Sequence, residues 1–364
     1  MSRRRGFLGH RLRTQLDDKT PQRKEVLHFI SSGKPTASIE FRSTRGLSLT
    51  KIFFATDVHG SGRTFRKFTN AGKFYRVDAL ILGGDLTGKM VVPIIRQPDN
   101  TWRIDFLGTS YVLKAENEVQ NMEKSISESG YYPYRTETQE VEELTKEKID
   151  ALFLKLMMER LSSWVKLIEE RLTATGIKVY VTGGNDDPLE IEEILNSSDA
   201  VINAQDKVCR IDDYHEMISS GLSNPTPWKT RREVSEEKLG ESIEAMVSKV
   251  NDVKNAIFNI HVPPKDSSLD TCPLLDTSVS PPKPVMKQGQ MATYGAGSSA
   301  VRDSISRHQP LLGLFGHIHE SRGTVRIGRT LCINPGSEYS EGILRGAIID
   351  LEKDRIKNHQ LTSG

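Results

Sequence analysis

The chain has 364 residues, of which 36% are hydrophobic and 27% are charged, and its formal net charge is +2 at pH 7. This composition is typical of a globular protein with one large domain or two, and the net charge does not indicate a nucleic-acid binder, although nucleic acid stays open as a substrate. No segment approaches the roughly 18 apolar residues of a membrane-spanning helix, and three widely spaced cysteines predict no disulfide framework, which favours a cytoplasmic protein.

Residues 1–49 are expected to form a basic, partly flexible N-terminal extension. Five arginines, the first at Arg3 and the last at Arg13, precede the first acidic residue, Asp17. The apolar stretch after the first arginines is too short and too interrupted for a signal peptide. A solvated arm is therefore favoured over a contact with a polyanion or a partner protein. Within the extension, the pattern indicates a short helix around residues 24–30 and a strand around residues 37–42.

Five short apolar runs in the chain each end beside a side chain that can bind a metal. Such runs, bounded by Gly or Asp, predict buried strands, and the segment 63–75 after the first run predicts a helix. In open α/β sheets the ligand site lies beyond the carboxyl ends of the strands. We therefore expect one sheet to present seven candidate ligands along a single edge: Asp57, His59, Asp85, Asn185, His261, His317 and His319.

An insertion over residues 88–175 separates the second run from the third. Residues 91–96 and 102–107 flank a Gln-Pro-Asp-Asn turn and predict a β-hairpin, and residues 110–113 can add a strand. The polar segment 116–135 gives no clear assignment. Apolar residues recur every three or four positions within 141–172, which predicts one long amphipathic helix. This helix is expected to pack on the sheet; a homo-oligomer interface and a cap over the site are the alternatives.

Two loops are candidates for the wall of a substrate site. Residues 221–228 contain two prolines and end at Trp228, with Arg231 close behind; these two side chains could stack on a base and bind a phosphate. Trp228 could equally fix the loop to the core. The second loop, 262–299, is rich in proline and glycine and directly follows His261. After it we expect a hairpin of 323–327 and 330–333, a last strand at 346–351 and a tail at 356–364.

The seven candidate ligands have the chemistry of a site for two metal ions. Carboxylate and amide oxygens together with imidazole nitrogens suit Mn, Fe, Zn, Co or Ni, and no cysteine lies in any of the five segments. Seven ligands are too many for one ion, whereas two ions could share a bridging carboxylate. Two-metal sites of this kind are typical of phosphate-ester hydrolysis. Taken singly, Asp57 and Asp85 could also be ordinary helix caps.

The order of these motifs resembles the signature of the calcineurin-like metallophosphoesterases. D-x-H-G begins at Asp57, G-D ends at Asp85, G-N-x-D spans 184–187, His261 follows a strand alone, and G-H-x-H ends at His319. The resemblance implies a four-layer αββα sandwich over residues 50–355 that carries the hairpin and the long helix as an insertion. It implies two divalent ions, with Mn expected first, and a hydroxide that bridges them as the nucleophile.

The resemblance also implies a role for each ligand. One metal would be held by Asp57, His59, Asp85 and His319, and the other by Asp85, Asn185, His261 and His317, with Asp85 as the bridge. The residues expected to take part in catalysis are Asp57, His59, Asp85, Asn185, Asp186 and His317. Those expected to contact substrate are Asn185, Trp228 and Arg231.

The chain departs from the family pattern at Asp186, where many members have a histidine. An anion beside the metals would repel a dianionic monoester more than a diester with one charge less. The function expected is therefore that of a phosphodiesterase acting on a small molecule or a nucleotide. This assumes that Asp186 is ionised and faces the site. The alternatives are a phosphomonoesterase, acting on a protein or a nucleotide, and a non-catalytic scaffold that keeps the metal fold.

Overall fold

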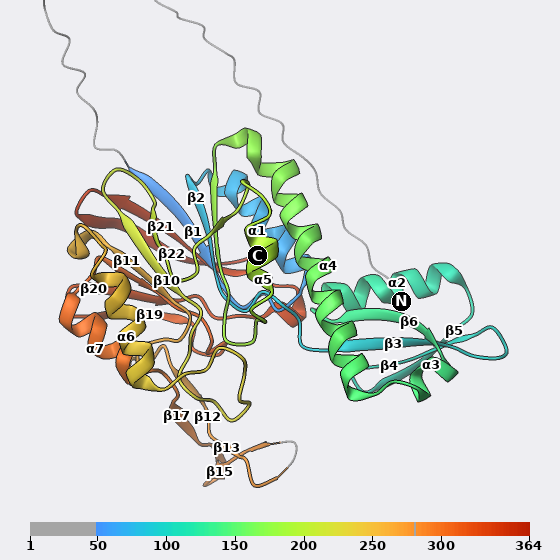
Figure 1. Ribbon diagram of the computed structural model, residues 1–364. Coiled ribbons are helices and arrows are strands. Elements are labelled where there is room, and N and C mark those ends of the chain that lie inside the picture. The colour runs from blue at the N-terminus through green and yellow to red at the C-terminus, as the bar shows by residue number, and fades with distance from the viewer. Residues whose placement is uncertain (1–48, 280–281) are drawn as a thin grey trace, which may run out of the picture. The chain divides into compact units, whose positions relative to one another are not determined.

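A computed structural model describes residues 49–279 and 282–364 (Figure 1). The expected N-terminal helix and strand, and the arginine-rich arm, lie outside the described residues. The described residues belong to one compact unit. None of the helices in the described part of the chain is long and apolar enough to span a membrane.

The first of two central sheets has the strand order β22-β21-β1-β2-β7-β8. Strands β1, β2, β7 and β8 run parallel to one another, while β21 and β22 are antiparallel to their neighbours. Residues 52–55 of β1 are fully buried, as expected for a parallel strand that is covered on both faces. The strands are β1 (Thr50–Ala55), β2 (Ala79–Gly83), β7 (Lys178–Thr182), β8 (Ile202–Asn203), β21 (Arg345–Glu352) and β22 (Arg355–Ser363).

The second sheet has the strand order β19-β20-β18-β11-β10-β9. Its central strands are parallel, and the edge strands β9 and β19 are antiparallel. The predicted hairpin near the C-terminus is confirmed as β19 and β20. The strands are β9 (Val208–Arg210), β10 (Glu216–Ser220), β11 (Ile257–Ile260), β18 (Leu312–Leu314), β19 (Gly323–Ile327) and β20 (Thr330–Asn334).

The two sheets pack face to face between two layers of helices (Figure 1). Successive side chains of a strand point to opposite faces, so Phe54 packs between the sheets while Phe53 packs against helices. The helices on the first sheet are α1 (Gly62–Tyr75), α4 (Lys146–Leu172) and α5 (Ile191–Leu195); those on the second are α6 (Glu236–Val247) and α7 (Ser299–His308). The expected four-layer αββα sandwich is thus confirmed.

The insertion has its own small sheet and core. The predicted hairpin is confirmed as β3 and β4, and the unassigned segment forms helix α2 and strand β6, which pairs with β3 in parallel. Apolar side chains such as Ile94, Val119 and Ile126 are buried between sheet and helix. The elements are β3 (Val91–Arg96), β4 (Trp102–Phe106), β5 (Thr109–Leu113), α2 (Glu116–Glu128) and β6 (Tyr132–Glu137).

Two expected boundaries differ from the structure. The long helix α4 begins at Lys146 instead of 141, because the Thr145 side chain caps it by accepting from the Lys148 N–H; Thr138–Glu142 is a separate short helix, α3. The expected tail at 356–364 is instead strand β22, antiparallel to β21. Most of its side chains are exposed, so the sequence lacks the alternating apolar pattern that predicts a strand.

The loop at 262–299 contains short antiparallel strand pairs. Strand β12 (Thr271–Pro273) pairs with β17 (Thr293–Gly295), and two smaller pairs extend from them. The smaller strands are β13 (Leu275–Asp276), β14 (Lys283–Pro284), β15 (Met286–Lys287) and β16 (Gln290–Met291). Short 3-10 helices occur at Thr173–Thr175, Val253–Asn255 and Tyr339–Glu341.

Candidate metal centre

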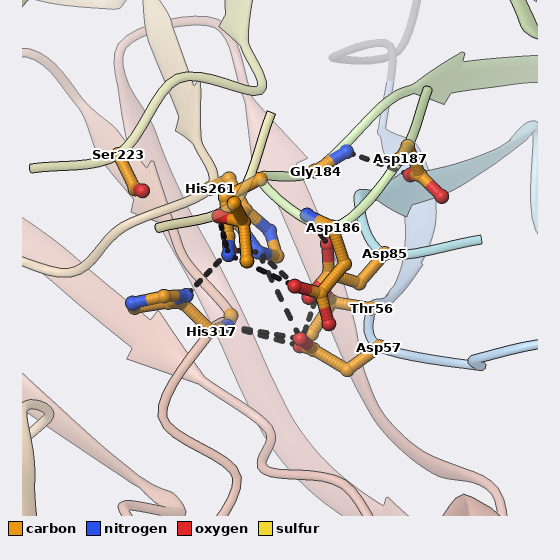
Figure 2. Close-up of polar contacts among 12 residues, drawn as sticks. Thr56, Asp57, Asp85, Gly184, Asp186, Asp187, Ser223, His261 and His317 are labelled. Atoms are coloured by element: carbon orange, nitrogen blue, oxygen red, sulfur yellow. Dashed lines mark hydrogen bonds and ion pairs between the residues drawn. The ribbon is translucent and has the colours of Figure 1, made fainter. Parts of the chain in front are cut away.

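The candidate ligands lie beyond the carboxyl ends of five strands, and they come from both sheets. Asp57, Asp85 and Asn185 follow β1, β2 and β7 of the first sheet; His261 follows β11 of the second, and His317 and His319 follow β18. The expectation that a single sheet would supply all of them was therefore wrong. The two sheets meet here, so donors far apart in the sequence converge (Figure 2).

Several of these residues have a positive φ angle, a backbone conformation that residues other than glycine rarely adopt. The φ angles are 54° at Asp57, 38° at His59, 50° at Asp85 and 66° at His317. Such conformations are unfavourable and tend to occur at functional sites. Hydrogen bonds between neighbouring turns hold two of them, because Asp57 N donates to Gly84 O at 2.9 Å and His59 N to Asp85 O at 2.9 Å.

One group of donors consists of Asp57, His59 and His319. Nε2 of His319 lies 3.3 Å from Asp57 Oδ1, and Nε2 of His59 lies 3.1 Å from Nε2 of His319. The ligand atoms of these three residues all lie within 4.8 Å of one another. Asp57 and His59 are buried, so bulk water does not reach their side chains.

A second group consists of Asp85, His261 and His317, joined by the amide of Asn185. Asn185 Oδ1 lies 2.7 Å from His317 Nδ1 and 3.1 Å from His261 Nε2. Asp85 Oδ2 lies 3.3 Å from His261 Nε2 and also 3.5 Å from His59 Nε2 of the first group. A single carboxylate oxygen thus faces both groups, which is the arrangement of a bridging ligand.

A hydrogen-bond relay orients the Asn185 amide. Asn185 Nδ2 donates to Thr230 Oγ1 at 2.8 Å, and the Thr230 hydroxyl donates to Glu233 Oε1 at 2.8 Å. Because the Thr230 hydroxyl donates its hydrogen bond to Glu233, its oxygen has a lone pair free to accept from the Asn185 amide. Asn185 Oδ1 is therefore turned toward His261 and His317.

The donor set fits divalent cations. Burial alone would raise the pKa of Asp85, but His261 and His59 beside it hold this pKa well below its usual value, so the carboxylate is ionised. Burial and the neighbouring His261 lower the pKa of His317 to about 4, so its imidazole is neutral. Ionised carboxylates and neutral imidazoles are the protonation states that bind metals.

The same carboxylates create a demand for positive charge at the centre. Burial opposes protonation of His261, but Asp85 and Asp57 outweigh it and raise the pKa of His261 to about 10. A divalent cation would neutralise the charge of these carboxylates in place of the protonated His261. Metal binding is then expected to release a proton from His261.

Asp186, the residue that departs from the family pattern, faces the site. Its Oδ2 lies 3.3 Å from Lys89 Nζ and 3.9 Å from His59 Nδ1, and its backbone N–H donates to Asp85 Oδ1 at 3.0 Å. Burial and the nearby Asp85 raise the pKa of Asp186 to about 6. Lys89 was not among the site residues expected from the sequence, where the only signal is its position shortly after the G-D motif.

Asp187 has a structural role that the sequence did not reveal. Its buried carboxylate accepts hydrogen bonds from the backbone N–H groups of Leu86 (2.9 Å), Thr87 (2.8 Å) and Gly184 (2.8 Å), and from the Thr87 hydroxyl (2.8 Å). It therefore fastens the loop after β2 to the loop after β7. Because these loops carry Asp85 and Asn185, Asp187 fixes the spacing of two candidate ligands.

A cleft of about 850 Å³ opens from the donor groups. The loop at 221–230 contributes Trp228, which is 63% exposed, and the loop at 262–299 contributes Lys265 and Tyr294. Phe153 and Met157 of α4 also line the cleft, while later residues of this helix pack on the first sheet. Arg231 does not line it; its guanidinium lies 3.8 Å from Glu190 Oε2. Of the two expected substrate contacts on this loop, Trp228 therefore lines the cleft and Arg231 does not.

No family model matches the chain. Among curated proteins it is similar to the uncharacterized protein MJ1162 of Methanocaldococcus jannaschii, with 29% identity over 161 residues. This match covers 44% of the chain and 64% of the relative, so the chain spans less than two thirds of the length of that relative.

Solved structures with a similar fold cover most of the chain. One crystal structure matches with a TM-score of 0.53 and 16% identity over 87% of this chain and 99% of the other. The protein TT1561 of Thermus thermophilus matches with a TM-score of 0.48 and 13% identity, covering 87% and 99%. A dimetal phosphatase from Danio rerio matches with a TM-score of 0.40 and 10% identity, covering 86% and 98%. The first of these similarities supports the fold; the convergence of the five motifs agrees with the family resemblance.

Proposed function

We propose that this chain is a metal-dependent phosphodiesterase. The observation that carries the proposal is the convergence of two donor groups on one oxygen, Asp85 Oδ2. One ion would be held by Asp57, His59, Asp85 and His319, and the other by Asp85, Asn185, His261 and His317. Mixed oxygen and imidazole donors suit Mn, and Fe, Zn, Co or Ni fit the same set.

Two ions at these positions would supply an activated bridging water as nucleophile and would neutralise charge on the phosphoryl oxygens. The protein itself has three tasks. Asp85 fixes the distance between the two donor groups, and the hydrogen bond to Thr230 keeps the Asn185 oxygen directed toward His261 and His317. The buried floor formed by Asp57 and His59 limits access of bulk water, so substrate has to approach from the cleft.

The surroundings of Asp186 support a diester as substrate. The histidine that many family members have here can carry positive charge and protonate a leaving oxygen, which suits a dianionic monoester. Asp186 paired with Lys89 gives no net charge at this position. The cleft of about 850 Å³ also offers room for a second substituent on phosphorus. The exposed ring of Trp228 offers a stacking surface for the base of a nucleotide.

A metal-supplemented screen tests this proposal. The apo-protein is reconstituted with Mn, Zn, Fe, Co or Ni, and hydrolysis of bis(p-nitrophenyl) phosphate is compared with that of p-nitrophenyl phosphate and of cyclic and linear dinucleotides. We expect a higher kcat/KM for diesters than for the matched monoester. A preference for the monoester would identify a phosphomonoesterase. Full metal loading without turnover of any ester would instead identify a non-catalytic scaffold.

A further inference from the structure

Lys89 stands at the end of a loop whose backbone is fixed on two sides. The Asp187 carboxylate accepts hydrogen bonds from the backbone N–H groups of Leu86 and Thr87, and Gly88 N donates to the Tyr132 hydroxyl at 2.8 Å. Tyr132 belongs to β6 of the insertion, so Lys89 is held between the metal-site loops and the inserted sheet. The backbone at Gly88 packs so closely on Gly130 O that an added Cβ would lie 2.0 Å from this oxygen.

The Lys89 side chain reaches from this loop into the cleft. It lines the cleft together with Asp85, Asn185 and His317, and its Nζ lies 3.3 Å from Asp186 Oδ2. An ammonium group has three N–H donors. Among the polar contacts of residues 49–279 and 282–364, the Nζ of Lys89 has a partner only in Asp186. The other N–H donors of the Lys89 ammonium are therefore available to a group bound in the cleft.

Asp186 places this ammonium beside the candidate ligands. Its carboxylate belongs to a cluster with His59 and Asp85, in which the ligand atoms lie within 4.8 Å of one another. The side chain and the backbone of Asp186 thus connect Lys89 Nζ to Asp85, since Asp186 N donates to Asp85 Oδ1 at 3.0 Å. A cation fixed in this way lies beside the candidate ligands and lines the cleft that leads to them.

We propose that Lys89, positioned by Asp186, contacts the phosphoryl or leaving-group oxygen of the substrate. This inference rests on the proposed function and deepens it. Lysine supplies a fixed positive charge and donor hydrogens instead of a proton that is transferred. Its contribution is therefore electrostatic, and such contributions are large where charge develops in a transition state.

The experiment compares Lys89→Met, Lys89→Arg and Asp186→Asn in the metal-loaded protein. Lys155→Met is the matched control, because Lys155 lies on an exposed position of α4, carries the same charge and is absent from the cleft. The readouts are metal content, kcat and KM for a diester, and the Kd for inorganic phosphate by calorimetry. We expect Lys89→Met to keep its metals, to lower kcat/KM about 10²-fold, and to weaken phosphate binding about 10-fold.

Further variants separate contact from positioning. Lys89→Arg keeps the charge and should recover most of the phosphate affinity. Asp186→Asn should cause a smaller loss, and this loss should vanish when Lys89 is already Met, because a positioning residue acts only through its partner. Unchanged phosphate affinity and unchanged kcat/KM in Lys89→Met would overturn the inference. If the wild type hydrolyses no ester but Lys89→Met still weakens phosphate binding, the contact stands and the proposed activity fails.

Discussion

Oδ2 of Asp85 lies 3.3 Å from Nε2 of His261, although the two residues come from different sheets. Asp85 follows β2 and His261 follows β11, so this contact links the carboxyl ends of one strand from each sheet. Gly84 makes the approach feasible: a Cβ added there would lie 2.4 Å from His261 Nδ1. The same Asp85 oxygen faces His59, so loss of one carboxylate should affect both donor groups.

The first prediction concerns Asp85→Asn. An amide has only one oxygen and no charge, so it cannot neutralise two divalent ions as a carboxylate does. We expect occupancy of both metal positions to fall and kcat for a diester to drop by about 10³-fold. Metal analysis of the purified variant, together with its kinetics, provides the measurement. Two bound metals and near-wild-type turnover in this variant would exclude the dinuclear arrangement.

His319→Ala should have a more local effect. His319 contacts Asp57 and His59 and belongs only to the first group of donors. We therefore expect one metal to be lost and the ion near Asn185 and His261 to stay. Titration with Mn followed by calorimetry or by metal analysis would count the remaining sites. Equal depletion of both sites would contradict the division of the ligands into two groups.

Thr230→Val tests the relay that orients Asn185. Valine keeps the shape of threonine but removes the hydroxyl that accepts from Asn185 Nδ2. Loss of such an outer hydrogen bond typically lowers metal affinity 10- to 100-fold, and we expect this loss at the site that includes His261 and His317. Thr230→Ser keeps the hydroxyl and serves as the control. If Thr230→Val binds metal as tightly as the serine variant, the relay does not orient the ligand.

The local motifs could be predicted from the sequence because each combines a short apolar strand with the ligand directly after it. The placement of these strands in two sheets could not, since a buried parallel strand has the same pattern in either sheet. Contacts between distant residues were also missed. Asp187 accepts a hydrogen bond from Thr87, which lies 100 residues away in the sequence, and Lys89 forms an ion pair with Asp186 over a comparable separation. Nothing local in the sequence marks these pairs.

Asp212 provides a prediction about pH and stability away from the candidate metal centre. Burial raises its pKa, but hydrogen bonds from His215, Thr50 and the Tyr214 N–H outweigh burial and place the folded pKa below its usual value. A depressed carboxyl pKa adds stability above the unfolded pKa of about 3.9, and this stability is lost as the pH falls through the folded value.

We therefore expect Asp212→Asn to lower the free energy of unfolding at pH 7, and the difference from the wild type to shrink below about pH 4. Urea unfolding of both proteins at pH 7 and pH 3 measures this difference. A difference of the same size at the two pH values would mean that the charge of Asp212 does not contribute.

The last prediction concerns the choice between monoesters and diesters. Asp186→His removes a carboxylate beside the metals, introduces a donor, and leaves the Lys89 ammonium without its partner. Each of these changes favours a dianionic substrate. General acid catalysis typically contributes 10² to 10⁴ in rate, so even a partly aligned histidine should raise the monoester-to-diester ratio of kcat/KM about 10-fold.

The measurement uses p-nitrophenyl phosphate and its bis ester with wild type and variant under saturating Mn. Asp186→Asn is the control, because it removes the negative charge without adding an imidazole. A rise in the ratio for both variants would assign the effect to charge, whereas a rise for Asp186→His alone would assign it to proton donation. If the ratio stays unchanged in both while the metal content is intact, substrate choice depends on the cleft walls around Trp228 and Tyr294, and position 186 does not set the preference for diesters.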